Sequence, residues 1–208
     1  ARTRPEPRSS RRRTATLESR AAPAVECPRW PRRGVTSSRG GASCTSSAAL
    51  GAGGGQYDML KLLEMSTEMH EKLLAECRQR RIGFTFSAFD EQVVDYVAEL
   101  GVEWFKVPSG EITNMPYLCR VGGYARKVLL STGMSTMDEA CAAISVLEAS
   151  GTSRRDITVL HCNTEYPTPM TDVNLRAMNA MADVLDVAVG YSDHTLGIEV
   201  PIASVAIK

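Results

Sequence analysis

The sequence predicts an α/β fold, a partial (β/α)₈ (TIM) barrel with about five of the eight βα units of a complete barrel, preceded by a disordered segment. From residue 56 onward, short apolar runs alternate with stretches of helical period. The runs begin about 20 to 30 residues apart, which is the length of one βα unit and predicts a parallel sheet. No Rossmann glycine fingerprint follows the first run, and this favours a barrel over a doubly wound sheet.

Residues 1–55 differ in composition from the rest of the 208-residue chain. They contain eleven Arg, no Lys and three Glu, a net charge of +8, whereas residues 56–208 have a net charge of −8. Ala, Arg, Ser, Gly and Pro dominate without any sustained period, so we expect disorder. An organellar transit segment and a basic arm for nucleic acid are two interpretations. The absence of Lys favours a third, a stretch foreign to the fold such as a misread GC-rich coding region.

The first predicted elements lie between residues 67 and 101. A helix is predicted over Thr67–Arg81, because apolar residues recur every four positions along it. The aromatic and β-branched run Phe84–Phe86 predicts a strand. A second helix, Asp90–Leu100, places its apolar residues on one face, and Gly101 is its expected stop.

Two strands and a helix are predicted in the middle of the chain. The apolar runs Trp104–Val107 and Val128–Leu130 predict buried strands. A helix is expected over Thr136–Ser150, because its first residue and Glu139 have the spacing of a capping box. Gly151 is expected to end this helix.

The C-terminal part repeats the same alternation. Ile157–Leu160 and Val187–Val189 are predicted strands, and Asp172–Leu185, which follows a Pro-Thr-Pro turn, is a predicted helix. Ile198–Lys208 has the pattern of the start of another helix.

Composition also bears on the environment of the protein. No apolar run is long enough to span a membrane, and no secretory signal is visible, so we expect a soluble cytoplasmic protein. The six cysteines are widely scattered without a C-x-x-C pair. This pattern favours buried free thiols over disulfides and argues against structural zinc.

Each predicted strand is followed by a small group of polar residues or glycines. In a (β/α)₈ barrel the carboxyl ends of the strands form the active-site face, so we expect these groups to meet in one bowl. In strand order they are Ser87; Lys106, Ser109, Gly110 and Glu111; Ser131, Thr132 and Gly133; His161, Asn163, Thr164, Glu165 and Tyr166; and Ser192, Asp193 and His194.

The contents of the bowl indicate an anion site. Lys106 supplies one cation, and several hydroxyl groups can donate hydrogen bonds to a phosphate. These hydroxyls belong to Ser87, Ser109, Thr164 and Ser192. The alternative is that Lys106 extends from the strand end to water. Its neighbours in the strand are aromatic or apolar, and this favours a functional role for its charge.

Other polar residues of the bowl leave alternatives open. His194 is a candidate metal ligand, with Asp193 or a backbone carbonyl fixing its tautomer, or a structural histidine in a turn. Glu111 can grip a sugar hydroxyl or transfer a proton, or serve as a charge at a helix start. Tyr166 can pack over a ligand or wall the turn. We favour a hydrogen-bonded inner-layer role for His161.

Four motifs together resemble a known family. They are FKVPSGEITNMPYL, VLLSTGMSTMDEA, LHCNTEYPTPMTDVNLRAM and VGYSDHTLGIEVPIA, in this order. They closely resemble the sialic acid synthase family, the N-acetylneuraminate synthases and their legionaminic acid relatives. The resemblance covers about residues 56–206 and implies a (β/α)₈ barrel, often followed by a small antifreeze-like domain. It further implies condensation of phosphoenolpyruvate with N-acetylmannosamine or a related 2-acetamido sugar and water, giving a nonulosonic acid and phosphate.

The same resemblance implies roles for particular residues. Glu111 and Tyr166 contact the sugar in catalysis, and His194 is one of two histidines that bind Mn²⁺ or Mg²⁺. The remaining residues bind phosphoenolpyruvate, chiefly its phosphate: Lys106, Ser87, Ser109, Thr164, Ser192 and Asn163. No membrane or nucleic acid partner is implied. The homodimer usual in the family forms through a domain that this sequence does not contain.

Departures from the family pattern bear on competence. The chain lacks the first two barrel strands and the second metal histidine, so we expect unpaired edges, poor solubility and little or no activity. FTFSAFD replaces the usual Ser-Thr-Pro-Phe-Asp around Ser87. Another phosphoenolpyruvate-dependent synthase of a keto sugar acid is the alternative enzyme. A non-catalytic basic-armed binding protein is the alternative outside enzymes.

Overall fold

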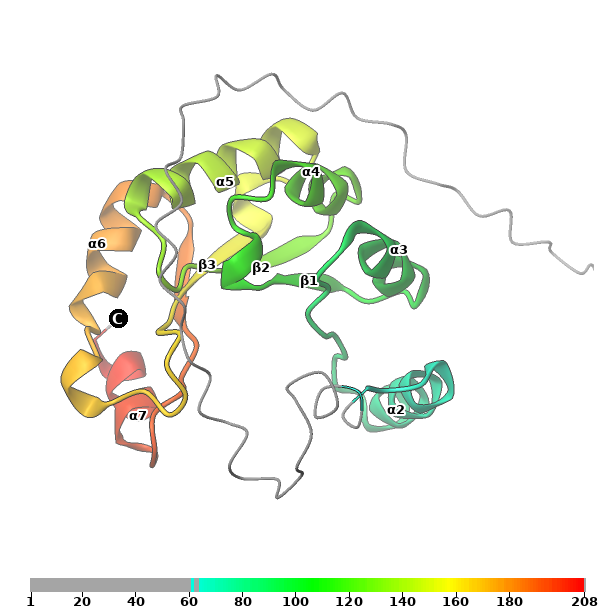
Figure 1. The fold of residues 1–208 in the computed structure, drawn as a ribbon, viewed down its shortest axis with the longest axis horizontal. Coiled ribbons are helices and arrows are strands. Elements are labelled where there is room, and N and C mark those ends of the chain that lie inside the picture. The colour runs from blue at the N-terminus through cyan, green and yellow to red at the C-terminus, as the bar shows by residue number, and fades with distance from the viewer. Residues whose placement is uncertain (1–60, 62–63, 208) are drawn as a thin grey trace, which may run out of the picture.

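A parallel sheet forms the centre of the computed structural model, which describes residue 61 and residues 64–207 (Figure 1). Its four strands are neighbours in chain order, and every pair is parallel. They are β1 (Trp104–Val107), β2 (Lys127–Ser131), β3 (Ile157–His161) and β4 (Ala188–Tyr191). This order is that of successive units of a (β/α)₈ barrel, so the predicted fold class is confirmed for a partial barrel. The segment 1–55 predicted to be disordered lies outside the described residues.

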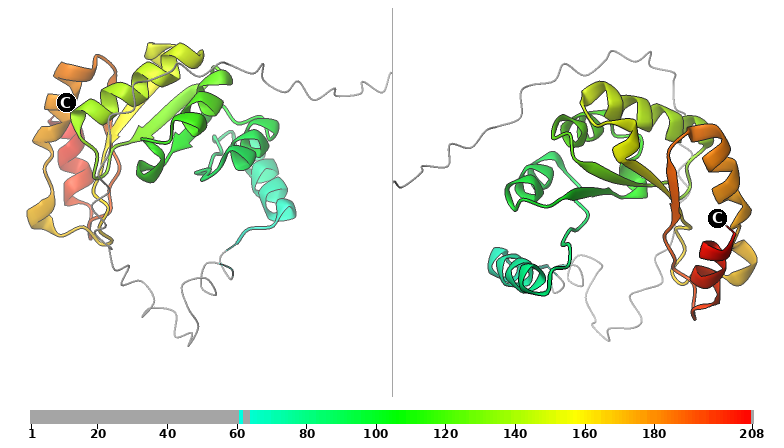
Figure 2. Two further views of the ribbon diagram at one scale, coloured as in Figure 1. Left: turned by 45° about the horizontal axis from the view of Figure 1, so that its top comes forward. Right: turned by 180° about the vertical axis from the view of Figure 1, so that it is seen from behind.

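Helices cover one side of this sheet. Figures 1 and 2 show α3 to α6 as an arc along the outer side of the strands, with α2 and α7 at the two ends of the arc. The helices are α2 (Thr67–Arg80), α3 (Glu91–Glu99), α4 (Met115–Gly123), α5 (Met137–Ser150), α6 (Arg176–Leu185) and α7 (Glu199–Ala206). Short 3₁₀ helices at Ser109–Glu111, Arg154–Asp156 and Met170–Asp172 lie in the connections. None of the described helices is long and apolar enough to cross a membrane.

Local capping explains where the predicted helices begin and end. The Asp90 side chain accepts a hydrogen bond from the N–H of Val93 at the start of α3. Thr136 and Glu139 form the predicted capping box of α5. Gly151 follows α5 with φ of 127°, a conformation that side chains disfavour.

The predicted strand Phe84–Phe86 is wrong, because no strand forms there. One isolated parallel bridge, between Ser87 and Lys106, is the backbone pairing of this segment with the sheet in the described residues. The Thr85 hydroxyl donates to the carbonyl of Trp104 at 2.9 Å. A side-chain hydrogen bond therefore occupies an acceptor at the edge where a ladder could have formed.

Helix α4 is not predicted from the sequence, and helix α6 begins later than predicted. In α4, Pro116 sits in the first turn, where its missing N–H costs no hydrogen bond, and the Asn114 side chain caps it. The helix expected from Asp172 begins at Arg176, because a 3₁₀ turn and the extended residue Val173 precede it.

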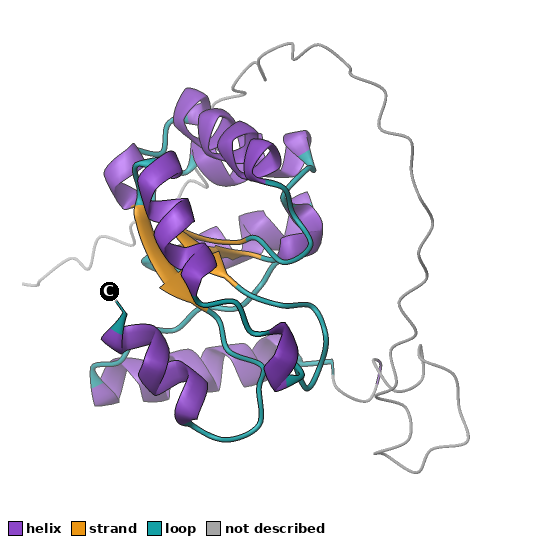
Figure 3. Ribbon diagram, turned by 90° about the vertical axis from the view of Figure 1, so that its left-hand side faces the viewer, coloured by secondary structure: helices purple, strands orange, loops and turns teal. Residues whose placement is uncertain are grey.

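The two faces of the sheet differ. The outward-facing residues of the first three strands are fully buried under the helices: Phe105, Val107, Val128, Leu130, Ile157 and Val159. Lys106, Leu129 and Thr158 are in register on the opposite, inner face and are half-buried. Figure 3 shows the strands in the middle of the ribbon, flanked by helices. Polar side chains at the ends of the strands are thus placed on the inner face of a partial barrel.

Three described cysteines, Cys77, Cys141 and Cys162, are free thiols as predicted. Cys119 is disulfide-bonded, so the prediction of free thiols is wrong for this residue.

Candidate functional site

Lys106 is the charged centre of the candidate site. Its side chain projects from β1 on the inner face, and its ammonium donates hydrogen bonds to the hydroxyl of Ser131 and, at 3.4 Å, to the carbonyl of Val107. Burial lowers the pKa of Lys106 below its ordinary value, while the nearby Cys162 acts in the opposite direction. Among the described residues, no carboxylate forms an ion pair with it. The site therefore holds a half-buried cation that lacks a counter-ion.

Ser87 lies beside Lys106 although the predicted strand before it does not form. The two residues are partners in the isolated parallel bridge, which places them on the same face of the sheet. Gly83 allows the approach of this segment, because a Cβ there would overlap the Trp104 ring at 1.9 Å.

Ser109 and Thr164 come together around Gly133, in the loop that follows β2. The N–H of Gly133 donates to the Ser109 hydroxyl at 2.9 Å, and that hydroxyl lies 3.5 Å from the sulfur of Cys162. Thr164 reaches the same point, since its methyl carbon is 2.6 Å from where a Cβ of residue 133 would be. Three of the loops after the strands thus contribute to one cluster, as the polar pattern predicts.

Two of the predicted substrate residues have other contacts. The Asn163 amide donates to the carbonyl of Asp172 at 3.1 Å, while its Oδ1 is buried without a partner in the described structure. Ser192 extends the sheet beyond β4, its N–H donating to the carbonyl of His161 at 2.9 Å. No described contact joins Asn163 or Ser192 directly to Lys106.

His194 and Tyr166 are neighbours across two loops. Their rings meet edge-on with centroids 4.4 Å apart. The N–H of Thr168 donates to the carbonyl of His194 at 2.8 Å, tying the loop after β3 to the loop after β4. Burial lowers the pKa of His194, with Asp193 opposing and Lys106 adding to this effect. The lowered pKa favours the neutral imidazole, which is the form that binds metals.

The surroundings of His194 leave one ring nitrogen for a divalent cation. Its Nδ1 is buried and has no hydrogen-bond partner among the described residues, so this nitrogen is available as a ligand. Asp193 does not fix the tautomer as expected, because its Oδ1 accepts from the N–H and hydroxyl of Thr195 at 3.0 and 2.8 Å. In the described part of the chain, no group of three or more His, Cys, Asp or Glu residues forms a complete ligand set. His194 thus fits as one ligand.

Glu111 lies in the 3₁₀ helix that follows β1. Its carboxylate accepts a hydrogen bond from the Asn114 amide at 2.7 Å, close to the start of α4. It is half-buried and pairs with no basic residue in the described structure.

The histidines outside this cluster have local partners. His161 packs against Tyr191 with centroids 5.7 Å apart and hydrogen-bonds to the backbone of Asn174, which agrees with the predicted inner-layer role, while its Nε2 is buried without a partner in the described structure. The ring of His70 stacks on Phe86 with centroids 4.6 Å apart, and its Nδ1 contacts the Tyr96 hydroxyl at 3.1 Å.

Three residues contact those predicted to bind substrate. Ser131 receives the hydrogen bond from Lys106, Cys162 touches Ser109, and Gly133 gives both Ser109 and Thr164 their space. Ser131 and Gly133 are among the strand-end residues expected in the bowl, although the sequence assigns them no contact. Cys162 is not among them, because its role depends on which loops meet.

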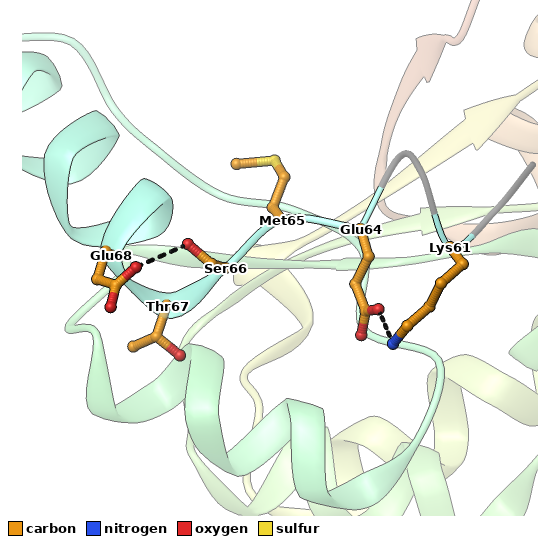
Figure 4. A pocket seen from close by; sticks show the side chains of 6 residues that line it. All are labelled: Lys61, Glu64, Met65, Ser66, Thr67 and Glu68. Carbon is orange, nitrogen blue, oxygen red and sulfur yellow. Dashed lines mark hydrogen bonds and ion pairs between the residues drawn. The ribbon is translucent and has the colours of Figure 1, made fainter.

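A separate pocket lies at the start of α2 (Figure 4). Its lining residues are Lys61, Glu64, Met65, Ser66, Thr67 and Glu68. Lys61 pairs with Glu64, and Ser66 donates to Glu68 at 3.3 Å, so its charges are satisfied locally. None of these residues belongs to the cluster at the strand ends.

The fold and the cluster define a class, the βα-barrel domains whose site is formed by loops at the carboxyl ends of parallel strands. Within this class, the chain belongs to the NeuB family, whose profile matches residues 32–207. The match begins within the segment 1–55. The sequence-based assignment to the sialic acid synthases is confirmed.

Two similar relatives are named as synthases. The chain is 44% identical over 152 residues to the N,N'-diacetyllegionaminic acid synthase of Campylobacter jejuni, covering 73% of this chain and 46% of that protein. It is 45% identical to the synthase of the same name from Legionella pneumophila, and the match covers 72% of this chain and 43% of that protein. The chain thus spans less than half the length of these curated relatives. A sialic acid synthetase structure from Leptospira borgpetersenii, in complex with citrate, matches with a TM-score of 0.68 and 29% identity. The match covers 72% of this chain and 51% of that protein.

Proposed function

We propose that this chain is part of a nonulosonic acid synthase. The reaction joins phosphoenolpyruvate to N-acetylmannosamine or a related 2-acetamido sugar, with water, and releases phosphate. The names of the relatives support synthesis of a sugar acid of this class. Because both are diacetyllegionaminic acid synthases, they favour an acceptor that carries two acetamido groups.

The half-buried ammonium of Lys106 is the observation that carries this proposal. A buried cation without a carboxylate partner is costly unless an anion neutralises it. Its described neighbours are hydroxyl and carbonyl oxygens and a thiol, all of which leave its charge unbalanced. A phosphate that is dianionic at neutral pH, with three acceptor oxygens, matches this environment.

The hydroxyl groups around Lys106 complete the proposed phosphate site. Ser87 lies beside it in the sheet, and Ser109 and Thr164 approach from the next loops. Ser192, at the end of β4, and Asn163, whose Oδ1 has no partner in the described structure, are the remaining proposed contacts to phosphoenolpyruvate. A phosphate held by one ammonium and several hydroxyls is oriented without being bound too tightly to leave.

Other residues of the site are proposed to act on the sugar. Glu111 and Tyr166, from loops after two different strands, contact the acyclic amino sugar. His194 is proposed as a ligand of Mn²⁺ or Mg²⁺, which when bound polarises the sugar aldehyde as a Lewis acid. The buried Nδ1 of His194 supports this role.

The proposed reaction balances without any further reactant. The C3 carbon of phosphoenolpyruvate attacks the aldehyde carbon, which forms the new C–C bond. The aldehyde oxygen becomes a hydroxyl by gaining the proton that water loses as its oxygen adds at C2. The C2–O bond to the phosphate then breaks while the new C2 hydroxyl becomes the keto group, so that the phosphate leaves with the bridging oxygen and the hydroxyl proton. Lys106 and the hydroxyl cluster bind the phosphate before this step and stabilise the negative charge that it gains when the bond breaks.

Binding of phosphoenolpyruvate to the 208-residue chain tests the proposal without requiring turnover. Calorimetric titration should show binding by the wild-type chain and an affinity at least about tenfold lower for Lys106→Met, which keeps the volume of the side chain and removes its charge. Lys127→Met is the matched control, because Lys127 is exposed at the opposite end of the adjacent strand. Equal affinity in all three proteins overturns the proposal.

The acceptor is tested separately with the same protein. Phosphate release from phosphoenolpyruvate is measured with N-acetylmannosamine, with its 2,4-diacetamido analogue and with arabinose 5-phosphate. Preference for the diacetamido sugar supports the acceptor favoured above, whereas preference for arabinose 5-phosphate assigns the chain to another synthase of keto sugar acids.

A further inference from the structure

Gly133 lies where the side chains of three strand-end residues converge. A Cβ at this position would be 2.6 Å from the Thr164 methyl carbon, 2.9 Å from the Ser109 hydroxyl oxygen and 3.4 Å from the Cys162 sulfur. The first two separations are shorter than real Cβ atoms show, so no larger residue fits without moving Thr164 or Ser109. Residue 133 is also fully covered by its surroundings.

The backbone does not explain why a glycine is needed here. Gly133 is not among the glycines with positive φ, whereas the next residue, Met134, has φ of 58° and is 84% exposed. The left-handed conformation is the one that favours glycine over other residues. The chain has its glycine at 133 and tolerates a strained methionine at 134, so the space around residue 133 is what the glycine provides.

The N–H of Gly133 also orients Ser109. It donates to the Ser109 oxygen at 2.9 Å and so occupies one of its lone pairs. The hydroxyl proton must then point elsewhere, and the sulfur of Cys162, 3.5 Å away, is a weak acceptor for it. A phosphate oxygen is a much stronger acceptor and can replace this sulfur at little cost.

We propose that Gly133 is a positioning residue of the anion site, which holds the hydroxyls of Ser109 and Thr164 ready to donate to the phosphate of phosphoenolpyruvate. This inference rests on the function proposed above. Gly133 itself need not touch the substrate. It acts through its N–H on Ser109 and through its lack of a side chain on Thr164.

The added methyl of Gly133→Ala would act directly on the proposed donors. Thr164 is β-branched, so its side chain relieves an overlap at the methyl carbon mainly by rotating about χ1. That rotation moves the hydroxyl together with the methyl. The Thr164 donor is thereby turned away from its present direction.

Binding of phosphoenolpyruvate and of inorganic phosphate to the 208-residue chain tests the proposal, with thermal unfolding of each variant measured in parallel. We expect Gly133→Ala to lower both affinities about tenfold, the contribution of one hydrogen bond to a charged group. The double variant Gly133→Ala/Thr164→Ser removes the overlapping methyl but keeps the hydroxyl, and it should regain most of the affinity. Met134→Ala, the neighbouring exposed residue, is the matched control and should bind as the wild type does.

Thr164→Val serves if Gly133→Ala does not fold. Valine preserves the shape against Gly133 but lacks the hydroxyl, so the affinity should again fall about tenfold. Wild-type affinity in Gly133→Ala or in Thr164→Val overturns the positioning role while leaving the proposed function intact. Failure of the wild-type chain to bind either anion overturns the proposed function, and the positioning role with it.

Discussion

The ring of Tyr166 meets the imidazole of His194 edge-on, with their planes at 79° and their centroids 4.4 Å apart. The two residues come from loops after neighbouring strands, and a parallel bridge between Thr168 and Thr195 joins the same loops. Tyr166 is 57% exposed, so its ring covers the imidazole from the solvent side rather than filling the core. The contact joins two residues that the sequence indicates only as separate candidates for the site.

Removing the Tyr166 ring should raise the pKa of His194. Burial is the main cause of its lowered pKa, and Tyr166→Ala exposes the imidazole, so the value should move back toward 6.5. Tyr166→Phe keeps the aromatic edge and should leave the pKa where it is in the wild type. An NMR titration of the His194 ring protons measures both changes. Equal pKa values in the alanine variant and the wild type would show that Tyr166 does not shield His194.

The helical layer was largely predictable because its signals are local. The capping box at Thr136 and Glu139 forms as the spacing predicts, since both partners lie within one helical turn. By contrast, α4 has a proline in its first turn and ends in Gly122-Gly123, and both features are typical of helix breaks. Gly122 in fact allows close packing on α5, because a Cβ there would be 2.6 Å from that of Ser150. Such a contact depends on a residue far away in the sequence.

The site was predictable in its placement but not in its internal contacts. Parallel strands bring their carboxyl ends to one edge, so the meeting of Lys106 with Ser87 follows from the fold class. The contacts of Gly133 with Ser109 and Thr164 depend on the path of three loops, which no period or propensity describes. The failure of Phe84–Phe86 to form a strand has a similar origin, because a strand requires a paired neighbour as well as β-forming residues.

The outer layer contains an ion pair whose contribution to stability should depend on pH. Arg120 donates two hydrogen bonds to the Asp95 carboxylate, at 2.6 and 2.5 Å, and the Tyr124 hydroxyl adds a third at 2.7 Å. The Arg120 hydrogen bond lowers the pKa of Asp95 below 3.8, while burial opposes it. A carboxylate with a lower pKa in the folded state stabilises the fold above its unfolded pKa, and this stabilisation is lost as the pH falls through the folded value.

Asp95→Asn should therefore lower the free energy of unfolding by about 1 kcal/mol at pH 7, the upper range for a partly exposed pair. The difference from the wild type should shrink as the pH falls below 3.8. Urea unfolding at several pH values measures it. Asp183→Asn, which removes an exposed carboxylate of α6, is the control and should show no such trend. A difference that is constant with pH would contradict a role for the charge of Asp95.

The affinity for phosphoenolpyruvate should depend on pH through Lys106. Only the ammonium form balances the charge of the phosphate, and burial lowers the pKa of this group from 10.5. As the pH rises, the affinity should therefore begin to decline at a lower pH than it would for a lysine with the ordinary pKa of 10.5. The second ionisation of a phosphate is complete by then, since its pKa is about 6. Lys106→Arg remains charged throughout this range, so its affinity, even if weaker overall, should not decline. Calorimetric titrations between neutral pH and the pKa of free lysine distinguish these profiles, and parallel declines in both proteins would mean that another group carries the pH dependence.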